Sequence, residues 1–115
     1  MSELIFVTLY NETYLTRGIL LFESLMRVCQ NPFKMYILAL DDTVHNYWDK
    51  REEKNIGIIS LEDMIKIYPQ VERLQKERSQ TEFCWTLSAF SIQYVLKQYR
   101  HSMCIYIDAD MEFFF

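Results

Sequence analysis

The sequence has only two glycines and two prolines among its 115 residues. Because these residues are common in turns, we expect few loops, most of them short. No Gly-x-Gly-x-x-Gly motif follows the first apolar segment, which argues against a dinucleotide site of the usual Rossmann type. No apolar run reaches the length of a membrane span, so no transmembrane segment is predicted.

Acidic residues outnumber basic ones, with 16 Asp and Glu against 12 Lys and Arg. The net charge is −4, and no basic cluster is longer than Lys50-Arg51, so nucleic acid is not expected as a partner. The three cysteines form no Cys-x-x-Cys motif, and Met1-Ser2-Glu3 lacks the basic region of a signal peptide. These features predict a cytoplasmic protein with reduced thiols.

The sequence is rich in apolar side chains arranged in strand and helix patterns. Hydrophobic residues make up 50% of the chain, enough for a single well-filled domain spanning residues 1–115. Continuous apolar runs predict buried strands at residues 4–9, 34–40, 56–59 and 103–107. Helical spacing and capping signals predict helices at residues 14–28 and 44–54, after Ser60, and from residue 80 onward. The charged stretch 70–78 is expected to form a solvated helical face or a mobile loop.

This alternation of strands and helices is typical of a doubly wound α/β fold. We predict a Rossmann-like open sheet, mostly parallel, in strand order 3-2-1-4 with helices on both faces. Right-handed crossovers place strands two and three on one side of strand one, and the fourth strand is expected to pair on its other side. Ligands of such sheets bind at the carboxyl ends of the strands, beside the point where the strand order reverses. Here that point lies between strands one and four. The turn of residues 8–14 and the acidic segment 108–110 would face each other across it.

Two aspartates, Asp108 and Asp110, follow the fourth predicted strand. Burying an ionised carboxylate is costly unless it is paired or binds a metal, so these residues should mark the carboxyl end of the strand. Their spacing points both side chains to the same side, and the small Ala109 leaves room for a ligand. Two hard oxygen donors suit Mn²⁺ or Mg²⁺, which can bridge phosphates. The alternative is a solvated turn, because Asp-x-Asp is common by chance.

Other polar candidates are expected to be structural. Asp41-Asp42 follows the second predicted strand and could contact a ribose, but a solvated turn is the favoured interpretation. His45 and His101 are far apart in the sequence, and each is expected at the surface rather than as a third metal ligand. The last helix should be buried on more than one side, because further apolar residues widen a stripe formed by Trp85, Ala89, Ile92, Leu96 and Tyr99.

Two segments resemble the GT-A nucleotide-sugar glycosyltransferases, nearest to the glycogenin-like and bacterial lipopolysaccharide galactosyltransferase group. The first match comprises Phe6-Val7-Thr8-Leu9, Asn11, Tyr14, Gly18, Leu20 and Ser24-Leu25. The second comprises Glu82-Phe83-Cys84-Trp85-Thr86-Leu87 and Ile105-Tyr106-Ile107-Asp108-Ala109-Asp110. The likeness covers nearly the whole chain, in the right order and spacing.

The resemblance implies a metal-dependent glycosyltransferase that transfers a hexose from a UDP-sugar to an unidentified saccharide or lipid-linked glycan. It implies that Asp108 and Asp110 bind Mn²⁺ or Mg²⁺ on the diphosphate, with Asp108 also near the ribose. The uracil base would be held by hydrogen bonds and ring stacking at Thr8, Leu9, Tyr10, Asn11 and Tyr14.

The sequence departs from this family pattern in two places. A basic residue often found near the sugar phosphate has no clear match, because Thr81 and Glu82 stand at that position. The family also continues beyond the metal motif, where it supplies a histidine ligand and the acceptor site. We therefore expect residues 1–115 to be the nucleotide-binding part of a truncated enzyme that does not transfer sugar alone.

The same sequence features have two alternative interpretations. Phosphatases of the haloacid-dehalogenase type also use Asp-x-Asp, but at the beginning of their fold, so this alternative is disfavoured. A non-catalytic nucleotide-binding or interaction module is the stronger alternative. The apolar end, Phe113-Phe114-Phe115, predicts self-association into a homo-oligomer or a frayed end.

Overall fold

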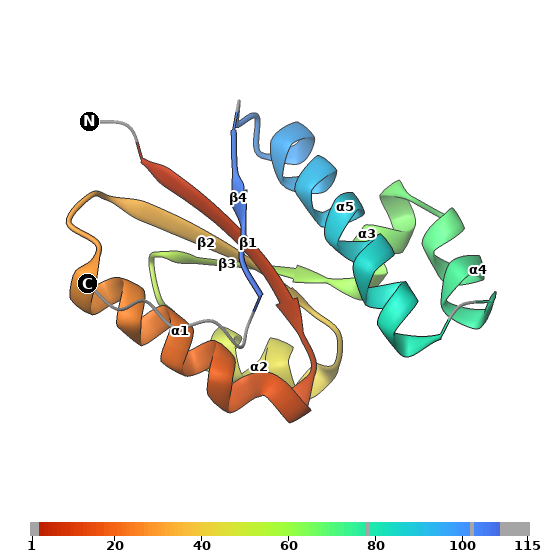
Figure 1. Ribbon diagram of the computed structural model, residues 1–115, viewed down its shortest axis with the longest axis horizontal. Helices are drawn as coiled ribbons and strands as arrows, with labels where there is room; N and C mark the ends of the chain where they lie inside the picture. The colour runs from red at the N-terminus through yellow and green to blue at the C-terminus, as the bar shows by residue number, and fades with distance from the viewer. Residues whose placement is uncertain (1–2, 78, 102, 109–115) are drawn as a thin grey trace.

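The computed structural model describes residues 3–77, 79–101 and 103–108, apart from the side chains of residues 80, 81, 84 and 85. Its centre is a parallel four-stranded sheet in the order β3-β2-β1-β4 (Figure 1). The strands are β1 (Leu4–Tyr10), β2 (Phe33–Ala39), β3 (Ile56–Ser60) and β4 (Ile105–Tyr106). The predicted Rossmann-like α/β fold with strand order 3-2-1-4 is therefore confirmed.

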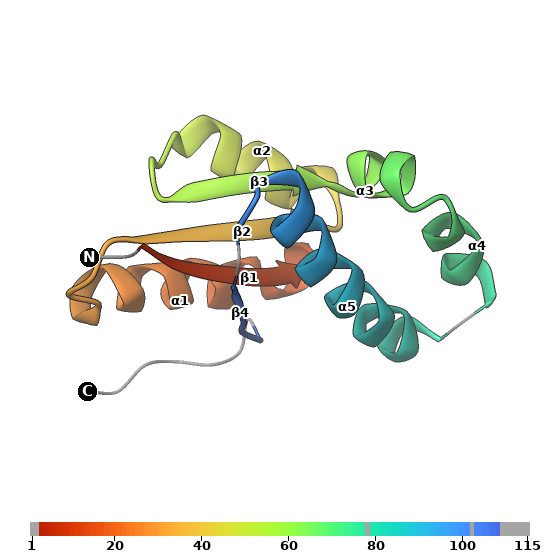
Figure 2. The ribbon, with the colours of Figure 1, turned by 90° about the horizontal axis from the view of Figure 1, so that it is seen from above.

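Helices cover both faces of this sheet. They are α1 (Leu15–Val28), α2 (Asp42–Arg51), α3 (Leu61–Ile67), α4 (Gln70–Glu77) and α5 (Gln80–Gln98), with a short 3-10 turn, η1 (Glu12–Tyr14), before α1. In Figures 1 and 2, α1 and α2 lie on one side of the sheet and α3, α4 and α5 on the other. None of the described helices is long and apolar enough to cross a membrane.

Successive side chains of β1 point into two separate cores. Phe6 and Tyr10 pack in the core that α1 and α2 cover, whereas Ile5, Val7 and Leu9 pack against α3, α4 and α5. Covering both faces removes the need for polar residues along a strand. This explains why β1 and β2 have continuous apolar sequences.

Side-chain caps fix where several helices begin. The Ser60 hydroxyl accepts a hydrogen bond from the Asp63 N–H at 3.0 Å, as the predicted capping box requires. Ser79 caps α5 in the same way, accepting from the Glu82 N–H at 3.2 Å. Most of the charged stretch after Pro69 forms the helix α4. The Val71 side chain of this helix is buried in the core.

The prediction that the fourth strand is buried on both faces was wrong. Only Ile105 and Tyr106 form β4, which pairs with no strand except β1 within the described part of the chain. Ile105 is 46% exposed, although Ile107, two residues later, is only 4% exposed. An apolar sequence alone does not distinguish an edge strand from a central one.

The prediction that α5 is buried on more than one side was also wrong for its described side chains. Phe83, Leu87 and Val95 are buried against the sheet. In the predicted stripe, Ala89 and Tyr99 are exposed. Apolar residues occur on several sides of this helix, so their spacing could not identify the face that meets the sheet.

Candidate functional site

The pairing of β4 with β1 brings the two predicted site segments to one edge of the sheet. Phe6 pairs with Ile105 and Val7 with Tyr106, and the Ile107 N–H donates to the Val7 carbonyl oxygen at 2.9 Å. The same register, continued by two residues, places Asp108 level with Leu9. The β1–α1 turn (residues 11–14) begins directly after β1. Asp108 and this turn therefore lie beside the point where the strand order reverses.

Asp108 has the exposed side chain that a cation or ligand would need. Asp110, the second predicted metal ligand, lies outside the described residues, as does the Phe113-Phe114-Phe115 end. Among residues 3–77, 79–101 and 103–108, no group of three His, Cys, Asp or Glu side chains is arranged to hold a metal ion. The metal site thus stays a prediction, and Asp108 is the one of its two predicted ligands that the structure describes.

The β1–α1 turn is ordered by Asn11. The Asn11 side-chain oxygen accepts a hydrogen bond from the Thr13 N–H at 3.0 Å and so caps η1. The Asn11 carbonyl oxygen accepts from the Tyr14 N–H at 3.1 Å. The Tyr14 ring is 48% exposed at the end of this turn. It is therefore accessible for stacking against a planar ligand.

Tyr10 contributes to the core rather than to an accessible surface. Its side chain is 2% exposed, and its hydroxyl oxygen accepts a hydrogen bond from Trp48 Nε1 at 2.7 Å. Burial raises the pKa of Tyr10, so the phenol stays protonated at neutral pH. Of the two tyrosines predicted to contact the base, only Tyr14 has a ring that a ligand can reach.

Thr8 and Leu9 are also covered by other parts of the protein. The Leu9 side chain is 8% exposed, and that of Thr8 is fully buried. The Thr8 hydroxyl has no hydrogen-bond partner among the described residues. A buried hydroxyl without a partner lowers stability, because it has lost its bonds to water.

Replacing Thr8 by Val should leave the free energy of unfolding unchanged or raise it by up to about 2 kcal/mol, because a methyl group removes the unpartnered hydroxyl. Denaturant unfolding measures the change. Thr13→Val makes the same chemical change at an exposed position and should have almost no effect. A loss of more than about 1 kcal/mol in Thr8→Val would show that the hydroxyl has a partner, such as an ordered water.

The prediction of a solvated turn at Asp41-Asp42 holds for Asp42, whose side chain is exposed, but was wrong for Asp41. One of its carboxylate oxygens, Oδ1, accepts a hydrogen bond from the Val44 N–H at 3.0 Å and caps α2. The other, Oδ2, accepts from the Glu12 N–H at 2.8 Å. The capping role could have been read from an aspartate three residues before Val44. The bond to Glu12 has no local sequence signal.

The two histidines, which were predicted to be surface residues, are half-buried. His101 Nε2 lies 3.0 Å from the Tyr36 hydroxyl oxygen, and the two rings are in contact. This bond links the segment between α5 and β4, which contains His101, to the middle of β2. His101 therefore has a structural partner in the core.

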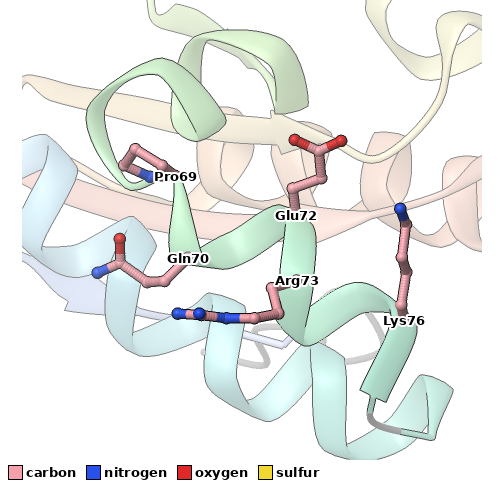
Figure 3. A pocket seen from close by; sticks show the side chains of 5 residues that line it. All are labelled: Pro69, Gln70, Glu72, Arg73 and Lys76. Carbon is pink, nitrogen blue, oxygen red and sulfur yellow. The ribbon is translucent and has the colours of Figure 1, made fainter.

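A separate open groove of about 370 Å³ lies along α4 (Figure 3). Its lining residues are Pro69, Gln70, Glu72, Arg73 and Lys76. Figure 3 shows Gln70 and Arg73 extending to one side of α4, and Glu72 and Lys76 to another. None of the predicted site residues lines this groove. It is therefore a competing location for ligand binding, against which the proposed site at Asp108 and the β1–α1 turn can be tested.

The chain is similar in sequence to a longer bacterial protein. No family model matches the chain. A protein of Bacillus subtilis (strain 168), described as the uncharacterized protein YfnF, is 27% identical over 113 residues. The match covers 95% of this chain and 35% of that relative, so the chain spans about a third of the relative's length. That description names no activity, and the likeness by itself favours no particular function.

Proposed function

We propose that this chain is the nucleotide-binding part of a metal-dependent glycosyltransferase whose donor is a UDP-sugar. The observation that supports the proposal is the parallel pairing of β4 with β1, which puts exposed Asp108 and the β1–α1 turn at one sheet edge. Open α/β sheets bind their ligands at this kind of edge. The acceptor would be a saccharide or a lipid-linked glycan, bound by other parts of the complete protein.

In this proposal the β1–α1 turn holds the base. The exposed Tyr14 ring offers a face for stacking on uracil. Asn11 Oδ1 is already occupied by the Thr13 N–H. The amide nitrogen of Asn11 is then the end of the side chain that can donate to a carbonyl oxygen of the base.

Asp108 and Asp110 would hold the cation. Carboxylate oxygens at an exposed strand end are the donors that Mn²⁺ and Mg²⁺ prefer, and Asp108 meets this description. A bound divalent cation would offset the negative charge of the departing diphosphate. The task of the chain itself is to orient the nucleotide between the turn and the strand end.

The test is a calorimetric titration with UDP and UDP-sugars, in the presence and absence of Mn²⁺. We expect UDP to bind with Mn²⁺ present, and Tyr14→Ala to weaken binding by about tenfold, since stacking contributes about 1–3 kcal/mol per base. Tyr14→Phe keeps the ring and is the matched control. If UDP does not bind, or if Tyr14→Ala binds it as tightly as the wild type, the proposal fails.

A non-catalytic nucleotide-binding module is the alternative. It requires only the β1–α1 turn, in which the Tyr14 ring is 48% exposed, and no metal or acceptor site. A transfer assay with a radiolabelled UDP-sugar, on the longest natural form of the protein, separates the two. Nucleotide binding without transfer would favour the module.

A further inference from the structure

A single carboxylate joins two strand-to-helix turns at the sheet edge where the nucleotide is proposed to bind. Asp41 stands between β2 and α2, and Glu12 stands between β1 and α1. Beneath them, the Leu40 N–H donates to the Tyr10 carbonyl oxygen at 3.1 Å, which continues the β1–β2 pairing up to the turns. The bond from the Glu12 N–H to the Asp41 side chain adds a further link, between Asp41 and the β1–α1 turn.

Both oxygens of Asp41 are used, and each accepts from a main-chain N–H. Oδ1 accepts from Val44 at 3.0 Å, and Oδ2 accepts from Glu12 at 2.8 Å. The first N–H groups of a helical turn have no acceptor within that turn, so Glu12 at the start of η1 needs an external one. The Thr43 hydroxyl adds a second link by donating to Glu12 Oε2 at 3.1 Å.

We propose that Asp41 is a positioning residue for nucleotide binding, an inference that rests on the proposed function. By holding the Glu12 N–H, it fixes the turn that carries Asn11 and Tyr14 before the ligand arrives. A turn ordered in advance loses less conformational entropy on binding, and the affinity is correspondingly higher. Direct contact between Asp41 and a ribose is not needed, because both of its oxygens already have partners.

The chain itself suggests the variant that separates the two bonds. Ser60 and Ser79 each cap a helix through the N–H three residues later, the same spacing that links Asp41 to Val44. Asp41→Ser should therefore keep the cap of α2. A serine has one short hydroxyl and cannot also reach Glu12 across the gap between the turns.

In the full chain, we expect Asp41→Ser to weaken UDP binding in the presence of Mn²⁺ by about five- to tenfold, the effect of losing one ordering hydrogen bond. Amide hydrogen exchange at Glu12 should become faster, while the melting temperature changes little. Asp42→Ser removes the same charge from the neighbouring, exposed position and should alter neither affinity nor exchange.

Three results would overturn the inference, and they are distinguishable from one another. If the wild type binds UDP and Asp41→Ser binds it equally well, Asp41 does not position the site, although the proposed function stands. If the wild type does not bind UDP at all, the proposed function fails and this inference fails with it. Weaker binding in Asp41→Ser together with the same loss in Asp42→Ser would show a general charge effect and would also contradict positioning.

Discussion

Replacing Gly18 by Ala should destabilise the protein by about 1–3 kcal/mol, the usual range for overpacking a core. A Cβ atom at this position would overlap the Tyr10 ring and lie 2.6 Å from its hydroxyl oxygen. The ring cannot easily move away, because it is 2% exposed and bonded to Trp48 Nε1 at 2.7 Å. The effect has the opposite sign to helix propensity, by which Ala is favoured over Gly by about 1 kcal/mol.

A double-mutant cycle checks the cause. In a Tyr10→Leu background, where the overlapping ring atoms are gone, Gly18→Ala should become neutral or stabilising. Denaturant unfolding of the four proteins gives the free energies. An equal loss in both backgrounds would mean that Gly18 is required for some reason other than the Tyr10 ring.

The combined substitution Asp108→Asn and Asp110→Asn should abolish the Mn²⁺-dependent part of UDP binding. Losing both carboxylates should weaken binding in Mn²⁺ by more than about tenfold, because even the loss of residues that only support metal ligands costs about 10- to 100-fold in metal affinity. The melting temperature should be nearly unchanged, because the Asp108 side chain is exposed. Calorimetry with and without Mn²⁺ measures the binding.

A matched control removes two carboxylates elsewhere. Asp42→Asn with Asp49→Asn changes the net charge equally on the exposed side of α2, and should leave UDP binding intact. Unchanged affinity in the Asp108 and Asp110 double variant would refute the assignment of these residues. A similar loss in both double variants would point to net charge rather than to a cation site.

Much of the fold could be predicted from local sequence patterns. The runs in β1 and β2 are continuously apolar because helices cover both faces, and this pattern is visible without the structure. Right-handed crossovers predicted strands two and three on one side of strand one, and the order 3-2-1-4 followed once the fourth strand was assigned to the other side. The strand order then predicted that Asp108 lies beside the β1–α1 turn.

Features that depend on contacts between distant residues could not be predicted in the same way. Tyr10 was expected at the ligand site, but its hydroxyl is bonded to a tryptophan 38 residues away. Asp41 was expected in water, but it bonds to Glu12, which is 29 residues away. An aromatic or acidic residue at a strand end has the same local pattern in either role, so only the tertiary structure separates them.

The most direct test of the nucleotide site is paramagnetic line broadening in ¹⁵N-labelled protein, with UDP and Mn²⁺ added and Mg²⁺ as the diamagnetic reference. If the cation and nucleotide bind at the reversal of strand order, the amide signals of residues 9–14 and 107–108 should broaden first. Those of residues 70–76, along the α4 groove, should stay sharp. Broadening centred on the groove, or none at all with UDP present, would contradict the proposed site.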